Sequence, residues 1–259
     1  MALLEVKDLT KSFGGVTAIA DLHFEVPESR VYSVIGPNGA GKTTLFNMLC
    51  GIYTPDQGSI RFQAQEITGL APHKIAGMGA SRTFQNLQMF FNMSVLDNVM
   101  VGCHLRTRSN LFSAALRLPG VIREERQARE WAREALAFCG LDSLIGRDAG
   151  SLPYGALKRL EIARALAVKP KLLMMDEPAA GLNDTETLEM RRLIRRISEA
   201  GITVLLVEHN MGLVMQVSDQ VLVLVLDYGS RLAEGTPEEI QNNPKVIEAY
   251  LGGEVQYAV

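Results

Sequence analysis

Hydrophobic and polar residues alternate in short bursts over residues 3–35, as in Leu-Glu-Val-Lys-Asp-Leu at 4–9. This alternation predicts strands of an antiparallel sheet with one buried face, because successive side chains of a strand point to opposite faces. Turns are expected at 14–15 and 27–28, where Gly-Gly and Pro-Glu interrupt the pattern. Another short strand is predicted at 59–62, after a Pro-Asp-Gln-Gly turn.

Three other segments, 31–35, 171–176 and 202–207, are mostly apolar without alternation. The last two are separated by 185–200, a stretch rich in Arg and Glu that predicts a helix. Apolar strands that alternate with helices indicate a parallel sheet covered on both faces. In such sheets, ligands bind beyond the carboxyl ends of the strands.

Strand patterns disappear between about residues 85 and 166. Helical spacing predicts helices at 95–100 and 122–138, the second mostly exposed to solvent. Residues 105–120 between them are expected to form a loop. That loop contains Arg106, Arg108 and Arg117. These arginines could form a basic patch, but a plain solvated loop is the favoured interpretation.

The composition of the 259 residues, 47% apolar and 21% charged, is that of a globular protein. A net charge of −3 provides no basic field that would attract nucleic acid. The three cysteines, Cys50, Cys103 and Cys139, form no C-x-x-C pair, which favours a reducing compartment over a disulfide or zinc framework. Without a signal peptide or an apolar run of about 20 residues, the chain is expected to be soluble.

Residues 36–44, Gly-Pro-Asn-Gly-Ala-Gly-Lys-Thr-Thr, match G-x-x-x-x-G-K-[ST] between a predicted strand and a predicted helix. Such a loop turns its N–H groups towards a phosphate, and the helix adds its positive dipole end. Lys42 would reach the β- and γ-phosphates, and the Thr43 hydroxyl would bind Mg²⁺. A glycine-rich turn without a ligand is the alternative, and the strand–loop–helix context argues against it. The candidate nucleotide-binding residues are Gly36, Pro37, Asn38, Gly39, Ala40, Gly41, Lys42, Thr43 and Thr44.

Polar residues at the ends of the two later apolar strands converge on the same edge of the sheet. The carboxylate of Asp176 is suited to orienting Mg²⁺. That of Glu177 is suited to acting as a general base for the attacking water. His209 could polarise the γ-phosphate. The alternative is a carboxylate pair that only caps a strand end. Gln85 could reach the metal or water through its amide, and Phe13 could stack on an adenine ring or pack as a buried aromatic.

With these residues assembled, the chain resembles the ATP-binding subunit of ABC transporters along nearly its whole length. After the phosphate loop, Gln85 stands at the Q-loop position and 152–156 at the position of the LSGGQ signature. Asp176 then ends the Walker B strand, Ala180-Gly181-Leu182-Asn183 occupies the D-loop position, and His209 is at the switch-histidine position.

The resemblance implies an α/β fold: a P-loop NTPase (RecA-like) core with a parallel sheet, an antiparallel β subdomain and an inserted α-helical subdomain. Within one ABC ATPase domain it implies the segments 1–84, 85–166, 167–235 and 236–259. These are the β subdomain with the first part of the core, the helical subdomain, the second part of the core, and a C-terminal helical extension.

The same resemblance assigns roles to the site residues, with ATP and Mg²⁺ as ligands. Catalysis would involve Glu177, His209, Lys42 and Gln85. Mg²⁺ would be held by Thr43, Gln85 and Asp176. The nucleotide would contact Phe13 and, across a dimer interface, the signature residues Leu152, Tyr154 and Gly155.

The stretch at 176–183 and the tail at 235–252 look like the LivG-type subunit of branched-chain amino acid importers. That similarity implies a peripheral protein on the cytoplasmic face of the inner membrane. Its expected partners are two transmembrane permease subunits, a second LivF-like ATPase and, indirectly, an external solute-binding protein, with no nucleic acid. An apolar cluster follows Gln85 and either docks the membrane partner or packs inside the helical subdomain. It consists of Leu87, Met89, Phe90, Phe91 and Met93.

The chain departs from the family pattern at four positions. In the signature, Pro153 replaces the serine, Tyr154 a glycine and Ala156 the glutamine. In the D-loop, Asn183 replaces the aspartate. A subunit that binds ATP without hydrolysing it therefore stays an alternative, although Glu177 and His209 argue for hydrolysis. Import of another amino acid, an amide or a urea-like solute, and a non-transport ABC ATPase, are the remaining alternatives.

Overall fold

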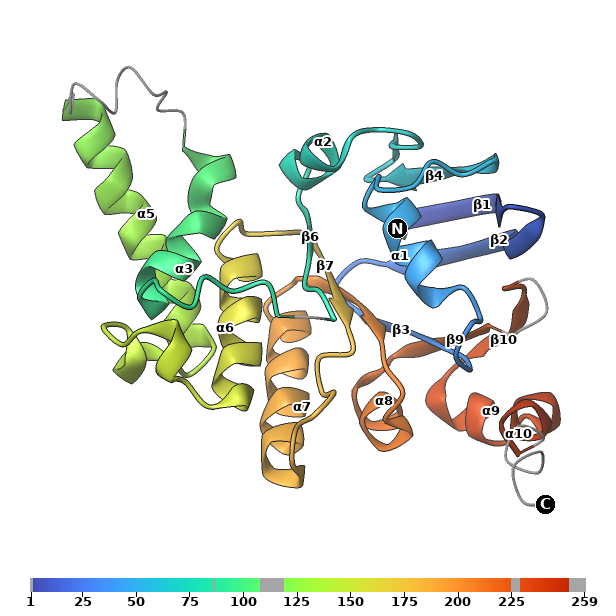
Figure 1. Ribbon diagram of the computed structural model, residues 1–259. Coiled ribbons are helices and arrows are strands. Elements are labelled where there is room, and N and C mark those ends of the chain that lie inside the picture. The colour runs from blue at the N-terminus through green and yellow to red at the C-terminus, as the bar shows by residue number, and fades with distance from the viewer. Residues whose placement is uncertain (1, 86, 108–118, 225–228, 252–259) are drawn as a thin grey trace.

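The computed structural model describes residues 2–85, 87–107, 119–224 and 229–251 (Figure 1). Arg108, Arg117 and the end of the predicted C-terminal extension, 252–259, lie outside these ranges. The strands are β1 (Ala2–Phe13), β2 (Val16–Pro27), β3 (Val31–Ile35), β4 (Gln57–Phe62), β5 (Gln65–Glu66), β6 (Ala80–Arg82), β7 (Leu172–Asp176), β8 (Thr203–Val207), β9 (Gln220–Leu224) and β10 (Arg231–Gly235).

The helices are α1 (Lys42–Leu49), α2 (Pro72–Gly77), α3 (Val95–Gly102), α5 (Pro119–Phe138), α6 (Tyr154–Leu166), α7 (Asp184–Glu199), α8 (Met211–Val217), α9 (Pro237–Gln241) and α10 (Pro244–Leu251). Short 3₁₀ turns are η1 (Cys103–Arg106), η2 (Asp142–Leu144) and η3 (Ala149–Ser151). Among the helices so described, none has the length and apolar character that crossing a bilayer would need.

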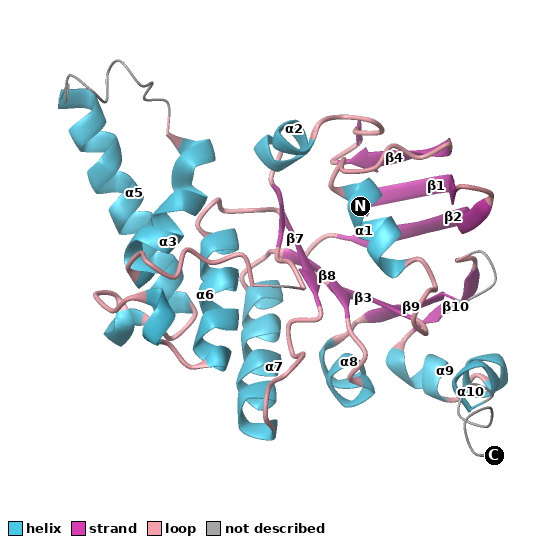
Figure 2. Ribbon diagram, viewed as in Figure 1, coloured by secondary structure: helices cyan, strands magenta, loops and turns pink. Residues whose placement is uncertain are grey.

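The alternating N-terminal segment forms an antiparallel sheet in the order β2-β1-β4-β5. On β2 the alternation is visible directly, because Leu22, Phe24 and Val26 are buried and the residues between them are exposed. Gly14 and Gly15, both with positive φ, make the turn between β1 and β2 at the predicted place. Figure 2 shows this sheet standing apart from the main sheet.

The main sheet has the order β10-β9-β3-β8-β7-β6, in which only β10 runs antiparallel to its described neighbour. Every residue of β3, β7 and β8 is buried. Alternate residues of each strand enter different cores: Leu172 and Met174 face α1 and the antiparallel sheet, whereas Leu173 and Met175 face α7 and the helical region. This two-sided burial explains why these strands lack a polar face.

The edge strands β6 and β10 carry too little apolar pattern to be predicted. β6 has three residues, and β10 alternates no apolar side chains. Each forms because a neighbouring strand offers backbone hydrogen-bonding groups, β7 to β6 and β9 to β10.

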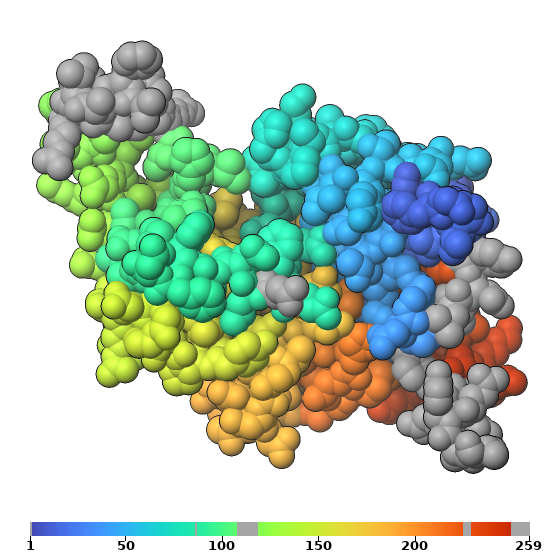
Figure 3. Space-filling view, in the orientation of Figure 1, coloured from blue at the N-terminus to red at the C-terminus, as the bar shows by residue number. Residues whose placement is uncertain are grey.

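In the described part of the chain between β6 and β7, helices α3, α5 and α6 pack around Val99, Leu136 and Leu160 (Figure 1). Figure 3 shows this region, green to yellow, on the opposite side of the molecule from the blue N-terminal sheet. Helix α5, Pro119–Phe138, includes the predicted helix at 122–138.

For Arg106, the favoured interpretation of a plain solvated loop is wrong, and the alternative of a basic patch does not hold either. Residues 103–106 form a 3₁₀ turn instead of a loop, and the guanidinium of Arg106 stacks 3.3 Å from the ring centre of Trp131. It also donates a hydrogen bond to the carbonyl of Ala167 at 2.9 Å. Arg106 therefore fastens η1 to α5 and to the end of α6, and its charge is not presented on a loop.

Candidate nucleotide-binding and catalytic site

The phosphate-loop sequence connects β3 to α1 and depends on glycine at two positions. A Cβ on Gly36 would lie 2.5 Å from the carbonyl oxygen of Leu224, and one on Gly41 would lie 2.3 Å from that of Ala18. Gly41 also has φ +83 and stands at the N-cap of α1 without a side-chain cap. The first N–H groups of α1 are thus left for an anion.

Lys42 lies inside the curve of this loop. Its side chain is buried, and its ammonium donates to the carbonyls of Gly36 at 2.6 Å and Pro37 at 2.9 Å. Burial lowers the pKa of Lys42, and the carboxylates of Glu177 and Asp176 oppose that shift. A phosphate oxygen would be a stronger acceptor for this ammonium than the two neutral carbonyls, so the cradle fits a nucleotide phosphate.

Asp176, the last residue of β7, forms a buried ion pair that no pattern in the sequence indicates. Its carboxylate accepts from Arg82 at 2.9 Å, and Arg82 also donates to Asn47 at 2.7 Å. The guanidinium lies 5.4 Å from the ring centre of Phe46 and 5.3 Å from that of Phe84. Arg82 gave no sequence signal because it stands in a short polar stretch without periodicity.

The oxygen donors present suit Mg²⁺. The candidates are the Thr43 hydroxyl at the start of α1, the Asp176 carboxylate and the Gln85 amide, which are hard ligands of the kind that Mg²⁺ prefers. Thr43 is exposed and Asp176 is buried. The amide nitrogen of Gln85 donates instead to Glu177, at 3.0 Å, so this structure engages Gln85 with the candidate base.

Glu177 is the point where three loops meet. His209 Nε2 lies 2.8 Å from one of its carboxylate oxygens, and Gln85 Nε2 donates to the other. Glu177 follows β7, His209 follows β8 and Gln85 follows β6, and the structure brings the three side chains together. Glu177 also has φ +49, a strained value for a residue with a side chain and one that is often found at functional sites.

The candidate signature residues begin α6 and pack against the D-loop segment. Pro153 is the N-cap, Leu152 is buried, and the exposed ring of Tyr154 lies against Gly181. A Cβ on Gly155 would lie 2.4 Å from a carboxylate oxygen of Glu186, so the start of α6 packs closely against the side chain of that residue in α7.

Phe13 ends β1 with 43% of its surface exposed, so it is not a core aromatic. Its ring meets that of Tyr53 edge to face at 5.2 Å, and the ammonium of Lys11 lies 5.4 Å from its centre. A flat, exposed ring of this kind is suited to stacking on a base. Tyr53 was missed because it lies in an irregular segment after α1.

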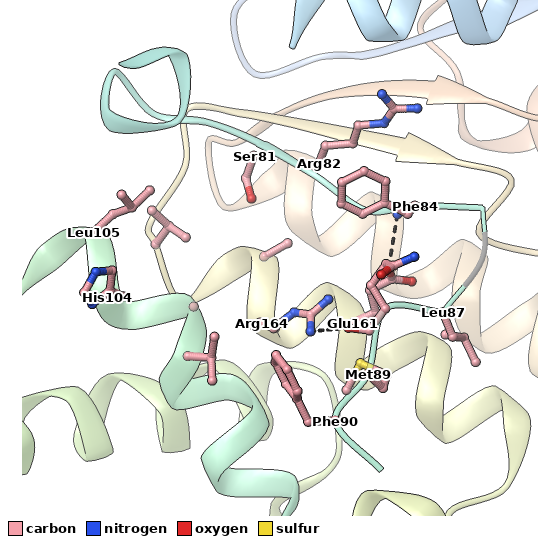
Figure 4. A pocket seen from close by; sticks show the side chains of 15 residues that line it. Ser81, Arg82, Phe84, Leu87, Met89, Phe90, His104, Leu105, Glu161 and Arg164 are labelled. Atoms are coloured by element: carbon pink, nitrogen blue, oxygen red, sulfur yellow. Dashed lines mark hydrogen bonds between the residues drawn. The ribbon is translucent and has the colours of Figure 1, made fainter. Parts of the chain in front are cut away.

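A cavity of about 580 Å³ opens beside Gln85, between β6 and the helices α3 and α6 (Figure 4). Its lining includes Phe84, Leu87, Met89, Phe90, Val101, Leu105, Glu161 and Arg164. Glu161 accepts from the N–H of Phe84 at 3.1 Å, and burial raises the pKa of that carboxyl.

The apolar cluster after Gln85 was expected either to pack inside the helical subdomain or to dock a membrane partner. Some of its residues are buried and others are exposed. Met89 is buried, whereas Phe90 and Phe91 are 45% and 51% exposed. Leu87 and Met93 are half-buried. We call the cavity and its exposed apolar rim, formed by Phe84, Phe90, Val101 and Leu105, the docking groove.

Comparison with known families decides the class of this protein. The family model described as "ABC transporter" matches residues 19–180. The chain belongs to the ABC transporter family. A second model, described as a branched-chain amino acid ATP-binding cassette transporter, matches residues 230–256. The chain is an ATP-hydrolysing subunit of this family, and the predicted P-loop NTPase fold is confirmed.

Named relatives cover nearly the whole chain. It is 47% identical over 251 residues to the Pseudomonas aeruginosa high-affinity branched-chain amino acid transport ATP-binding protein BraF, covering 96% of this chain and 98% of that one. It is 45% identical to Escherichia coli LivG, described in the same words, with the same coverage.

Solved structures of ATP-binding cassettes are similar to this chain over nearly its whole length. A nucleotide-free ATP-binding cassette from an ABC transporter has a TM-score of 0.84 and 34% identity, over 96% of this chain and 99% of that chain. The ADP conformation of an ATP-binding cassette of an ABC transporter has a TM-score of 0.84 and 31% identity, over 97% and 99%.

Gly41→Ala is expected to weaken nucleotide binding by roughly tenfold or more, because alanine resists positive φ and its Cβ would collide with the Ala18 carbonyl. Calorimetric titration with ATP measures the effect. Gly77→Ala in α2 is the control, since its Cβ meets open space and φ is not positive. Equal affinities for the two variants would contradict the assignment.

Proposed function

We propose that this chain is the ATPase that drives import of branched-chain amino acids. The observation that carries the proposal is Glu177 held between His209 and Gln85, at the strand edge that also bears the phosphate loop. The choice of solute is supported by the names of the relatives at 45–47% identity and by the match at residues 230–256.

In the proposed reaction, Glu177 accepts the proton of the water that attacks the γ-phosphate. Both of its carboxylate oxygens are engaged in this structure, one by His209 and one by Gln85. The carboxylate of Glu177 is therefore oriented, but neither oxygen is available to the water. Loss of the contact with His209 or with Gln85 would free one oxygen to accept the proton. Mg²⁺, held by Thr43, Asp176 and Gln85, would counter the charge of the phosphates when bound.

The family arrangement pairs this chain with a second, LivF-like ATPase. Leu152, Tyr154 and Gly155 would then contact the partner's nucleotide, with the uncapped N-terminus of α6 facing the phosphates. Pro153 is compatible with this end, because its backbone φ of −60 is the value that the proline ring imposes. Asn183 caps α7 by accepting from the N–H of Glu186 at 3.0 Å, so the amide serves there without a charge.

The docking groove is the proposed binding site for a transmembrane permease subunit. Each of the two ATPases would bind one of the two permease subunits. Its apolar rim includes Phe84, which directly precedes Gln85, so an inserted helix would touch the segment whose Gln85 contacts Glu177. The protein would thus be peripheral on the cytoplasmic face of the inner membrane, with an external solute-binding protein as an indirect partner and no nucleic acid. Residues 85–166 would move as the helical subdomain against the segments 1–84 and 167–235, with 236–259 as an extension.

Replacing the candidate base tests hydrolysis. Glu177→Gln is expected to lower the ATP turnover of the assembled transporter by roughly 100-fold or more while ATP still binds. A dimer trapped by ATP should appear in size-exclusion chromatography. Glu199→Gln, at the exposed end of α7, is the matched control. Retained turnover in Glu177→Gln would remove Glu177 from the mechanism.

Phe90→Asp is expected to weaken binding of the permease subunits by roughly tenfold, because it places a charge on the apolar rim of the docking groove. Thermophoresis with detergent-solubilised permease measures the affinity. Ile122→Asp is the control, since Ile122 is 50% exposed on α5 outside the groove. If both substitutions weaken binding equally, the groove is not the binding site.

The solute is tested in proteoliposomes that contain the assembled transporter. Leucine, isoleucine or valine on the solute-binding protein is expected to stimulate ATP hydrolysis and to accumulate inside. Stimulation by urea or a short amide, but not by these amino acids, would assign the chain to an importer of that other solute. Turnover without any transported solute would instead favour a non-transport ATPase.

A further inference from the structure

A buried carboxylate lies beneath the candidate catalytic residues. Glu208 follows β8 and is 3% exposed. One of its oxygens accepts from the N–H of Ala179 at 2.7 Å, and the other accepts from the N–H of His209 at 2.9 Å and of Asn210 at 3.2 Å. A single side chain thereby binds the loop after β7 and the loop after β8.

The charge of Glu208 is met by backbone amides. Within the described ranges, none of the ion pairs includes Glu208. A buried carboxylate without a cation is costly unless hydrogen bonds to it are short and well aimed. Glutamine could not reproduce this arrangement, because its side chain has one acceptor oxygen and a donor nitrogen.

The two loops that Glu208 joins carry the catalytic pair. Ala179 stands two residues after Glu177, and His209 directly follows Glu208. The N–H of Glu177 also donates to the carbonyl of Val207 at 2.8 Å. The strained turn at Glu177 is therefore fastened to the end of β8 on both sides, once by backbone and once by the Glu208 carboxylate.

Beyond these hydrogen bonds between the two loops, little holds the side chains of His209 and Glu177 together. His209 and Glu177 meet at 2.8 Å, yet 41% of the histidine side chain is exposed. Packing alone does not hold a side chain at such exposure, so the separation of the two loop backbones sets the distance between the groups. Small displacements of reacting groups have large effects on rate.

We propose that Glu208 is a positioning residue for ATP hydrolysis, which it serves by fixing the backbones of Glu177 and His209 relative to each other. The inference rests on the proposed function of the site, since it assigns a second residue to the same reaction. Glu208 touches neither the nucleotide nor the water, and acts through the two residues above it.

The test compares wild type with Glu208→Gln in the assembled transporter. We expect kcat to fall by roughly 10- to 100-fold while KM and the dissociation constant of ATP change less than about twofold. If Glu208 only stabilised the fold, Glu208→Gln would lower the melting temperature. At temperatures well below that melting temperature, kcat would then be unchanged. That second pattern would overturn the inference.

A double-mutant cycle adds an independent readout. If Glu208 acts through His209, adding Glu208→Gln to His209→Ala should reduce kcat further by less than about twofold. If the fold-loss of kcat in the double variant equals the product of the losses in the two single variants, the inference is refuted. Should Glu208→Gln fail to fold, Glu208→Asp replaces it, because it keeps both acceptor oxygens while moving them away from the amides. It should give the same pattern with a smaller loss.

The outcomes separate the two proposals. A wild-type protein that binds ATP but does not hydrolyse it, even with its partners, contradicts the proposed function and the inference with it. A wild-type protein that hydrolyses ATP, with an unchanged kcat in Glu208→Gln, contradicts the inference alone.

Discussion

The parallel register of β7 against β8 is the constraint on which the site depends. Asp176 pairs with Val207, so the residues that follow, Glu177 and Glu208, leave the sheet side by side. The next strand, β3, is in register with β8 on its other side and delivers the phosphate loop to the same edge. A shift of one residue along β8 would turn its side chains to the opposite faces of the sheet and separate His209 from Glu177.

This edge concentrates buried charge, and each charge has a local partner. Lys42 donates to loop carbonyls, Asp176 pairs with Arg82, and Glu208 accepts from backbone amides. Buried charges are costly without such partners. Stability comes instead from the apolar residues of β3, β7 and β8, which fill cores on both faces of the sheet. The apolar sheet thus holds a polar edge in place, which is the preorganisation that phosphoryl transfer uses.

The helical region is tied to the same edge through α6. The buried ammonium of Lys158 lies 3.3 Å from the carbonyl of Gln85 and 3.5 Å from that of Glu177, while Arg159 pairs with Glu189 of α7 at 2.7 Å. The docking groove borders the Gln85 segment from the other side. A membrane partner that moves α6 or that segment would therefore act on the residues around Glu177 by direct contact.

The sequence predicted the phosphate loop, the strands with continuous apolar runs and the polar residues that follow them, because each of these is a local pattern. It also determined the family, through the order of Gln85, Asp176, Glu177 and His209. Three features could not be predicted and emerge only from the fold: Arg82 meets Asp176, Glu208 joins two loops, and β6 and β10 extend the sheet. These features join residues far apart in the chain: Arg82 and Asp176 are 94 positions apart, and Glu208 and Ala179 are 29. No local periodicity records such a contact, since each partner alone is an ordinary polar residue and only strand register places it beside the other.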